Sequence, residues 1–253
     1  MTSLIHTTAA AVALSLASLS AQAAVVVTIE DPGVQSAQLG LIGATDAQVE
    51  TFDGIAAGTV LSGATTNTAV GVFSGGASNN STVQNANQYG GAGGTGRYLS
   101  ANNESQLQPL ILTLATPGTY FGFWWSAGNE AVLGGTGNQI ELLDINGDPF
   151  FSYDAADVID FLATRPDEAD FYGNPNGVNV NPTEAYAFLN MFSDQLIYGV
   201  TFSGCCFESD NHTTATSFSG ASGEAVNAAV PVPAAGALLL GGLAALLGLR
   251  RRR

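Results

Sequence analysis

Short apolar runs separated by turn-forming residues recur through the middle of the chain. They are rich in Val, Thr, Phe, Tyr and Ile and are bounded by Gly, Asn, Asp and Pro, which is the pattern of β-strands. The runs expected to form strands are 25–29, 107–114, 120–126, 139–143, 150–153, 196–203, 206–210 and 213–218. Asn146-Gly147 between two of these runs predicts a hairpin. Many short strands with long polar connections predict an all-β, jelly-roll-like sandwich.

Two segments have a helical pattern. They are 155–162 and 182–191, and Pro182-Thr183-Glu184 suits the first turn of the second. Residues 62–96 are different, because Gly, Ser, Asn and Thr dominate there. We expect this segment to be a long, flexible surface excursion.

Both ends carry apolar segments that we place outside the folded domain. Residues 4–23 are apolar, rich in Ala and Ser, and end in Ala21-Gln22-Ala23. This predicts a secretory signal peptide over 1–23, which the Sec machinery exports and signal peptidase removes. Residues 230–249 are long enough as a helix to cross a bilayer core of about 30 Å. The basic run 250–253 is expected to stay on the cytoplasmic side, which places 24–227 outside as one domain.

The second apolar segment combines three signals in a fixed order. They are a motif at 230–234 (Val230, Pro231, Val232, Pro233 and Ala234), an apolar stretch at 234–249, and four arginines (Arg250, Arg251, Arg252 and Arg253). This arrangement resembles the PEP-CTERM class of exosortase sorting signals, in the variant whose motif reads Val-Pro-x-Pro-Ala. The resemblance implies export by a Gram-negative bacterium that makes an exopolysaccharide. It also implies that an exosortase-type cysteine transpeptidase cuts near the motif. An uncleaved single-span anchor is the alternative.

Four segments of the body are similar to a family of exosortase-dependent surface proteins. They are Phe52 to Thr59, Gly94 to Ser100, Tyr120 to Trp125 and Phe207 to Asn211. The resemblance implies a β-sandwich similar in plan to carbohydrate-binding jelly rolls, with no catalytic activity.

The charge of the domain limits the classes of molecule that it can bind. All 21 acidic residues lie in 24–227, where Arg97 and Arg165 are the only basic residues, so the formal net charge of this part is −19. There is no lysine in the chain. Such a surface repels nucleic acid and attracts cations. We therefore expect no nucleic-acid partner.

The sequence offers little for catalysis. The two histidines are His6, in the expected signal peptide, and His212, which has no second His or Cys at ligand spacing. No Gly-x-Ser-x-Gly motif is present, and no pair of carboxylates stands out for glycoside hydrolysis. We expect a protein that is not an enzyme.

The carboxylates of this chain suit a structural calcium ion better than a catalytic role, because calcium binds several carboxylate and carbonyl oxygens. In carbohydrate-binding jelly rolls the first and last strands lie side by side and often share such an ion. The candidate ligands are Glu30, Asp31, Asp53, Glu208 and Asp210; the alternative is that Asp31 and Asp210 are turn residues. Asp144 to Asp148 resembles half a calcium loop, but a hairpin turn explains it better.

Trp124 and the two cysteines are the remaining candidates. Trp124 is a possible glycan contact, since aromatic faces stack on sugars, although a strand buried on both faces is favoured. Cys205 and Cys206 are adjacent. They fit a vicinal disulfide, two inter-chain bonds or buried thiols, and we favour the vicinal disulfide because Gly204 permits a bend.

The sequence thus predicts an exported surface or matrix protein with a structural or adhesive role in exopolysaccharide or biofilm. The alternative is a lectin-like module that recognises one glycan, and an extracellular hydrolase ranks third.

Overall fold

The computed structural model describes residues 24–61, 66–75, 81–103, 109–128, 137–175 and 181–226. They all lie in one compact unit, Ala23–Val230. The expected signal peptide and sorting signal lie outside the described residues. Within the described ranges, no helix is both long enough and apolar enough to cross a membrane.

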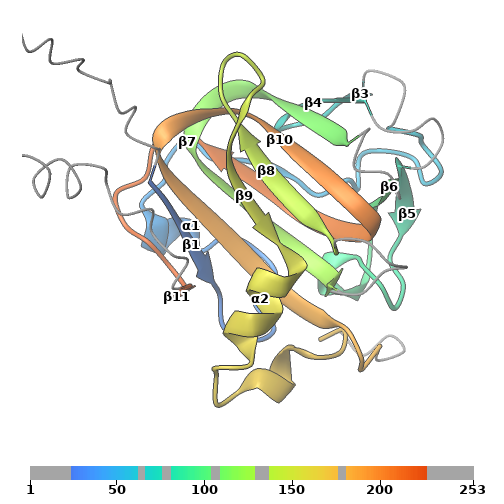
Figure 1. Cartoon of the computed structure of the whole chain (residues 1–253). Coiled ribbons are helices and arrows are strands. Elements are labelled where there is room, and N and C mark those ends of the chain that lie inside the picture. The colour runs from blue at the N-terminus through green and yellow to red at the C-terminus, as the bar shows by residue number, and fades with distance from the viewer. Residues whose placement is uncertain are drawn as a thin grey trace, which may run out of the picture. The chain divides into compact units, whose positions relative to one another are not determined.

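The fold is mostly β-sheet, as the sequence predicts, and each pairing between its strands is antiparallel (Figure 1). The strands are β1 (Val25–Ile29), β2 (Gln48–Glu50), β3 (Thr66–Asn67), β4 (Gly71–Gly75), β5 (Ser81–Asn85), β6 (Arg97–Asn103), β7 (Leu110–Gly128), β8 (Gln139–Leu143), β9 (Pro149–Asp154), β10 (Ala185–Ala215) and β11 (Glu224–Ala225). The helical elements are α1 (Leu39–Ile42), the 3-10 turn η1 (Ala92–Gly94), α2 (Ala155–Leu162) and the 3-10 turn η2 (Glu168–Phe171).

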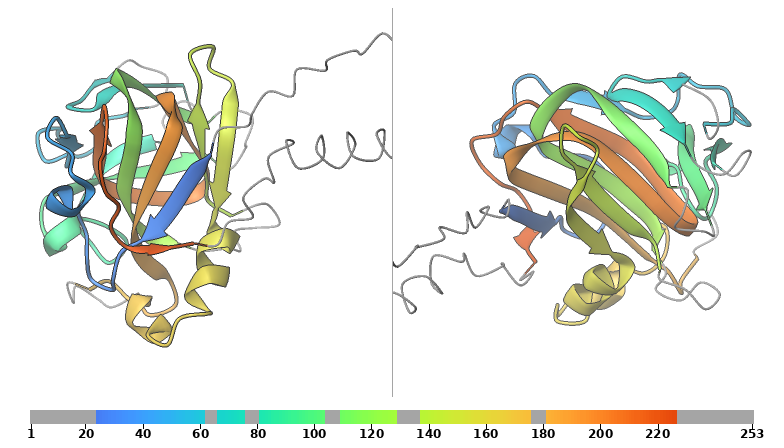
Figure 2. Two further views of the ribbon diagram at one scale, coloured as in Figure 1. Left: turned by 90° about the vertical axis from the view of Figure 1, so that its left-hand side faces the viewer. Right: turned by 45° about the horizontal axis from the view of Figure 1, so that its top comes forward.

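Two long strands, β7 and β10, pass through two layers of the sheet. In the first layer the order is β11, β1, the start of β10, the end of β7, the end of β10, then β2 and β6, with β5 outside β6. In the second it is β3, β4, the start of β7, the middle of β10, β8 and β9. The ribbons of β7 and β10 curve over together between the layers (Figure 2). This arrangement fits a β-sandwich.

The main core lies between the layers and draws on alternate residues of both. In the first layer, Phe121, Phe123 and Trp125 of β7 belong to it. In the second, Leu112 of β7 and Phe202 of β10 belong to the same cluster. Successive side chains of a strand point to opposite faces of the sheet, so alternate residues of β7 face the core. Because β7 also passes from one layer to the other, this single strand contributes to both walls of the core.

Pro117 and Gly118 lie between the two parts of β7 that pair in the different layers, and a side chain would not fit at Gly118. A Cβ atom on Gly118 would lie 2.1 Å from the backbone oxygen of Ala215 in β10. Proline interrupts the ladder of hydrogen bonds, and glycine allows the close approach of β10.

Local signals correctly predicted several elements. The strands 25–29 and 139–143 and the helix 155–162 have the bounds expected from the sequence. Asp154 and Asp157 cap the helix reciprocally at its start. The hairpin between β8 and β9 is also confirmed. Asp144 Oδ1 accepts hydrogen bonds from the backbone N–H groups of Asn146 (2.8 Å) and Asp148 (3.0 Å), and these bonds lower the pKa of Asp144, with the bond from Asp148 as the main cause.

The predicted helix at 182–191 is wrong, because β10 begins at Ala185. Tyr186 and Phe188 are buried on one face of the strand, while Leu189 and Met191 belong to the main core on the other. A strand buried on both faces is a continuous apolar run, which periodicity cannot distinguish from a helix.

The expectation that 62–96 is a flexible excursion is wrong for the described part of that segment. It contains β3 and β4, which pair with each other in the second layer, where β4 also pairs with β7, and β5, which pairs with β6 in the first layer. Phe73 and Val83 are completely buried in the main core. The few apolar residues of this polar segment are therefore the ones that anchor it.

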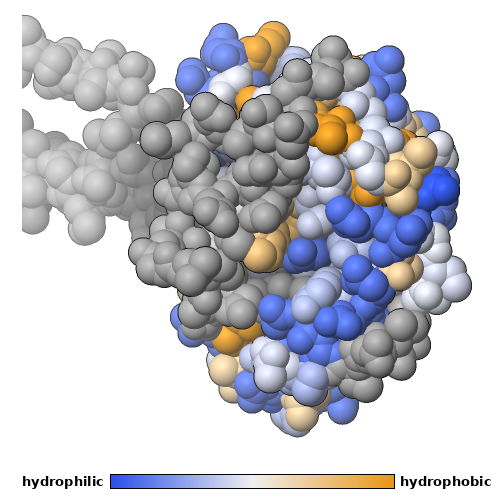
Figure 3. All heavy atoms as spheres, turned by 90° about the vertical axis from the view of Figure 1, so that its right-hand side faces the viewer, coloured by the Kyte–Doolittle hydropathy of each residue, from blue (hydrophilic) through white to orange (hydrophobic). Residues whose placement is uncertain are grey.

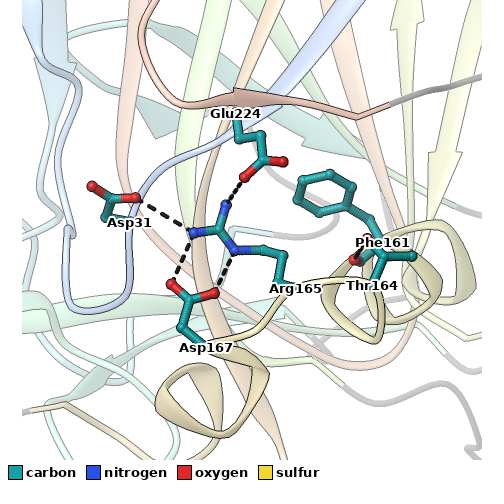
Figure 4. Close-up of polar contacts among 6 residues, drawn as sticks. All are labelled: Asp31, Phe161, Thr164, Arg165, Asp167 and Glu224. Atoms are coloured by element: carbon teal, nitrogen blue, oxygen red, sulfur yellow. Dashed lines mark hydrogen bonds and ion pairs between the residues drawn. The ribbon is translucent and has the colours of Figure 1, made fainter.

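Arg165, just after α2, connects segments from both ends of the domain (Figure 4). Its guanidinium forms ion pairs with Asp167 (2.8 Å), Glu224 of β11 (2.5 Å) and Asp31 after β1 (3.5 Å). It also lies 5.2 Å from the ring centroid of Phe171. The arginine side chain is 8 % exposed, whereas those of Asp31 and Glu224 are 85 % and 61 % exposed.

Substitution of Arg165 tests how much this contact stabilises the fold. We expect Arg165→Met to lower the free energy of unfolding by about 1 kcal/mol, because it removes the ion pairs with Asp167 and with Glu224 of β11. Asp31→Asn is the matched control and should change it by less than about 0.5 kcal/mol, since its pair is long and exposed. Urea denaturation measures both. Equal effects of the two substitutions would contradict a central role for Arg165.

Candidate functional site

The structure does not bring the five predicted calcium ligands together. Glu30 is buried and accepts hydrogen bonds from Asn190 Nδ2 (2.8 Å) and from the Ser222 hydroxyl. Asp31 pairs with Arg165, as described above. Within the described residues, no group of three or more His, Cys, Asp or Glu side chains is placed to hold a metal ion. A shared calcium site between the first and last strands therefore stays a prediction.

Asp53 and Asp210, two of the predicted ligands, do line one surface hollow. The hollow has a volume of about 290 Å³. Its walls come from Gln35, Ser36, Thr51, Asp53, Ala92, Gly93, Thr95, Asp210 and Asn211. Apart from Ala92, the side chains in the hollow are polar, and none is aromatic, so the hollow is suited to a hydrated polar group rather than to an apolar one.

Asp210 forms the buried end of this hollow. Its carboxylate accepts hydrogen bonds from the backbone N–H groups of Ala92 and Asn211, both at 2.7 Å. Burial raises the pKa of Asp210 to about 7, and these two hydrogen bonds limit the rise. Asp53 is exposed and accepts a hydrogen bond from the Arg97 N–H at 2.8 Å. The hollow therefore has one exposed carboxylate, Asp53, and one buried carboxylate, Asp210, whose pKa lies near neutral.

Glu208 lies on the same face of the sheet, in a row of polar residues. It pairs with Ser126 on β7 and with Ser100 on β6, and its Oε1 is 3.4 Å from the Ser100 hydroxyl. Burial raises the pKa of Glu208 to about 9, and the nearby charge of Glu184 raises it further. Glu208 is therefore mainly protonated and uncharged at neutral pH.

His212 is enclosed in the core, two residues after Asp210 but on the opposite face. The left-handed conformation of Asn211 (φ 50°) accompanies a shift in register between β10 and β7, which turns His212 inward. The rings of Phe52, Phe73, Phe121, Phe123 and Phe202 surround it, with centroids 5.1–6.0 Å away. Burial lowers the pKa of His212 to about 3, so the ring is neutral at ordinary pH.

The contact between Ser209 and His212 is not an accessible catalytic pair. The Ser209 hydroxyl lies 2.8 Å from His212 Nε2, and both side chains are 0 % exposed. A serine nucleophile must reach a substrate carbonyl, and the aromatic cage leaves no path for one. No local pattern in the sequence indicates this contact, because the contact depends on the irregularity at Asn211.

Trp124 does not offer a surface for stacking on a sugar. It is 1 % exposed and packs with Tyr186 at 5.8 Å between ring centroids. The favoured alternative, a strand buried on both faces, is confirmed. The reason is that the first layer has a second apolar cluster on its outer face, formed by Trp124, Tyr186 and Phe188.

Residues 86–95, which we call the covering segment, lie over this outer face. Tyr186 Oη donates to the Gln88 carbonyl oxygen (2.6 Å), and Tyr98 Oη donates to Asn87 Oδ1 (3.1 Å). A Cβ atom on Gly90 would be 2.5 Å from the Tyr98 ring, so only glycine lies this close to it. Gly90 therefore allows the covering segment to pack closely on the sheet.

Cys206 is exposed and has a left-handed backbone conformation (φ 60°), in line with the bend expected after Gly204. The side chain of Cys205 lies outside the described residues. The vicinal disulfide therefore stays a prediction.

The surface beside β5 and β6 is mainly hydrophilic (Figure 3). The acidic side chains of the domain have few basic partners, because the described residues contain two arginines and both are engaged. Arg97 Nη1 donates to the carbonyl oxygens of Asp53 (2.5 Å) and Ile55 (2.6 Å), and Arg165 forms its three ion pairs.

Comparison with known proteins adds no relative: the chain matches no family model, no curated protein and no solved structure.

The buried histidine predicts an acid-sensitive fold. The unfolded chain binds a proton at His212 below pH 6.5, whereas the folded chain resists until about pH 3. The stabilisation that neutral His212 provides is therefore complete above pH 6.5. It is lost by roughly 1.4 kcal/mol per pH unit as the pH falls from 6.5 towards about 3. We expect Ser209→Ala with His212→Phe to remove this loss, because phenylalanine does not titrate and alanine leaves no unpaired hydroxyl.

Ser209→Ala alone is the matched control, since it keeps the histidine. Denaturation at intervals from pH 7 to pH 4.5 should show the double variant gaining about 2–3 kcal/mol relative to this control. Parallel profiles for the two variants would mean that His212 is already protonated or accessible in the folded protein.

Proposed function

We propose that this chain is an exported surface or extracellular-matrix protein whose all-β domain has a structural or adhesive, non-catalytic role in exopolysaccharide or biofilm. The observation that carries the proposal is the charge of the domain. The domain has 21 acidic residues and two arginines. Both arginines are bound within the domain, which leaves its surface anionic.

An anionic surface binds an anionic or neutral polysaccharide best through cations. Divalent ions such as calcium take carboxylate oxygens and also sugar hydroxyl and carboxylate oxygens as ligands, so one ion can bridge the two polymers. Exposed carboxylates that have no partner among the described side chains are available for this bridging; Asp148, Asp160 and Asp170 are examples. In this proposal calcium acts between molecules and is not a resident cofactor.

The segments at the two ends of the chain support a route of export and processing. The pattern at 1–23 supports export through Sec and cleavage by signal peptidase. The motif at 230–234, with the apolar and basic residues that follow, supports processing by an exosortase-type transpeptidase. The pairing of β1 with β11 places the first strand beside the last, which supports a jelly-roll-like plan.

A lectin-like module that recognises a specific glycan is the second candidate. The hollow around Asp53 and Asp210 favours it, because its volume and its polar walls suit part of a sugar ring. The hollow lacks an aromatic side chain, which lowers its expected affinity for a sugar.

Binding to polysaccharide tests the role of charge. We expect the protein to co-sediment with the exopolysaccharide of its producing cells in calcium and to be released by chelator or by high salt. The triple variant Asp148→Asn, Asp160→Asn and Asp170→Asn should bind less, because bridging ions lose ligands. Gln48→Asn, at an exposed neutral position, is the control and should bind as the native protein does.

A glycan array distinguishes the two candidates. Saturable binding to one class of sugar that is lost in Asp53→Asn and unaffected by chelator would favour the lectin-like function and contradict cation bridging. Binding to neither polysaccharide nor arrayed glycans would contradict both.

Processing can be tested separately by intact mass and C-terminal peptide mapping. We expect the matrix fraction to contain a species that ends within 230–235, and we expect Pro231→Ala with Pro233→Ala to abolish it. Ala228→Gly with Ala229→Gly, outside the motif, is the control and should be processed normally. If every copy in native cells keeps Arg253 and stays in the membrane fraction, the tail is an anchor and not a sorting signal.

A further inference from the structure

The turn between β8 and β9 contains the dipeptide Asn146-Gly147, whose chemistry the proposed function does not use. Asparagine is a chemically labile residue, and it is most prone to deamidation before glycine, because glycine has no side chain to shield its own backbone nitrogen. Both residues are exposed, so water reaches them. The turn that joins the two strands is therefore also a candidate for spontaneous covalent change.

Deamidation is an internal substitution at the side-chain amide of Asn146. The backbone nitrogen of Gly147 loses its proton and attacks Cγ of Asn146, so that a new C–N bond forms and the bond from Cγ to Nδ2 breaks. Ammonia leaves with the proton, and the product is a cyclic succinimide. Water then opens the ring to aspartate or isoaspartate. The turn gains a negative charge in either case, and isoaspartate also lengthens the main chain.

Asp144 holds both of the groups that must react. Its backbone oxygen accepts a hydrogen bond from the N–H of Gly147 at 3.0 Å, which keeps the proton on the attacking nitrogen. Its carboxylate oxygen Oδ2 accepts a hydrogen bond from Asn146 Nδ2 at 3.2 Å, which holds the amide toward Asp144. Both bonds must break before the Gly147 nitrogen can combine with Cγ of Asn146.

The rest of Asp144 fixes the backbone on either side of the reacting atoms. Its Oδ1 accepts hydrogen bonds from the N–H groups of Asn146 and Asp148, as described above. Its own N–H donates to the Asp148 carbonyl oxygen at 2.9 Å. The negative charge of the carboxylate also disfavours the anionic nitrogen that the attack requires.

We propose that Asn146 is a latent deamidation site and that Asp144 protects it through these hydrogen bonds. Asp144 is thus a positioning residue for a reaction that the folded turn suppresses. Each hydrogen bond that must break before the attack slows the reaction by roughly two- to tenfold. The proposal rests on the hairpin alone and holds whatever the domain binds.

Peptide mapping by mass spectrometry, after incubation of the purified protein at neutral pH, measures the rate at Asn146 and separates it from the second Asn-Gly pair at 176–177. We expect Asp144→Ala to deamidate at Asn146 roughly three- to tenfold faster than the native protein. Asp144→Ser keeps a weaker acceptor for the N–H groups and should give an intermediate rate. Asp148→Ala is the matched control, because Asp148 contacts Asp144 through its main chain, and its rate should equal that of the native protein.

Incubation in urea separates protection by the folded turn from an effect of the local sequence. Circular dichroism first establishes that each variant is folded without urea. In the unfolded chains we expect the native protein and all three variants to deamidate at Asn146 at one rate, faster than the folded native protein. Equal rates in folded native protein and folded Asp144→Ala would overturn the proposal. A slower rate in folded Asp144→Ala would also overturn it, since the carboxylate would then be a base that removes the Gly147 proton.

Discussion

The antiparallel pairing of β7 with β10 is the constraint on which the rest of the fold depends. The end of β7 lies between two separate parts of β10, and its start lies between β10 and β4. Both layers of the sheet are therefore built from the same two strands, and a change of direction in one must be matched in the other. Gly118 is fixed by this requirement, because Ala215 of β10 passes against it. The core between the layers then forms from the inward side chains of both.

The same pairing determines where the titratable side chains lie. On β10, Glu208 and Asp210 point to the outer face of the first layer, and Ser209 and His212 point to the core. The covering segment closes over the outer face, so the two carboxyl groups lose most of their water without gaining a basic partner. Desolvation consequently raises both of their pKa values and lowers that of His212. The chemistry of this region thus follows from strand register more than from any motif.

The sequence allowed prediction of elements whose signals are local. The helix at 155–162 has its cap at Asp154, and the hairpin has Asn146-Gly147 at its turn; both signals act within a few residues. Elements determined by distant contacts were missed. Residues 182–191 and 62–96 were misassigned because burial on two faces, or a few anchors such as Phe73 in a polar segment, leaves no clear period. The candidate site shows the same division. The sequence analysis named both Asp53 and Asp210, which line one hollow, but it assigned the covering segment that shapes this hollow to a flexible excursion.

The distribution of basic groups links the fold to the proposed role. Folding brings many carboxylates close together, and their mutual repulsion destabilises the folded domain. A few well-placed cationic side chains offset this repulsion most effectively where segments of the chain meet. Arg165 is placed at such a junction, with Asp31, Asp167 and Glu224 from three parts of the chain around one guanidinium. Arg97 fixes the turn after Phe52 through backbone carbonyl oxygens. Since both arginines are needed inside the domain, compensation of the remaining surface charge falls to ions from the surroundings. An anionic surface of this kind gains interactions in surroundings that are rich in polysaccharide and divalent cations.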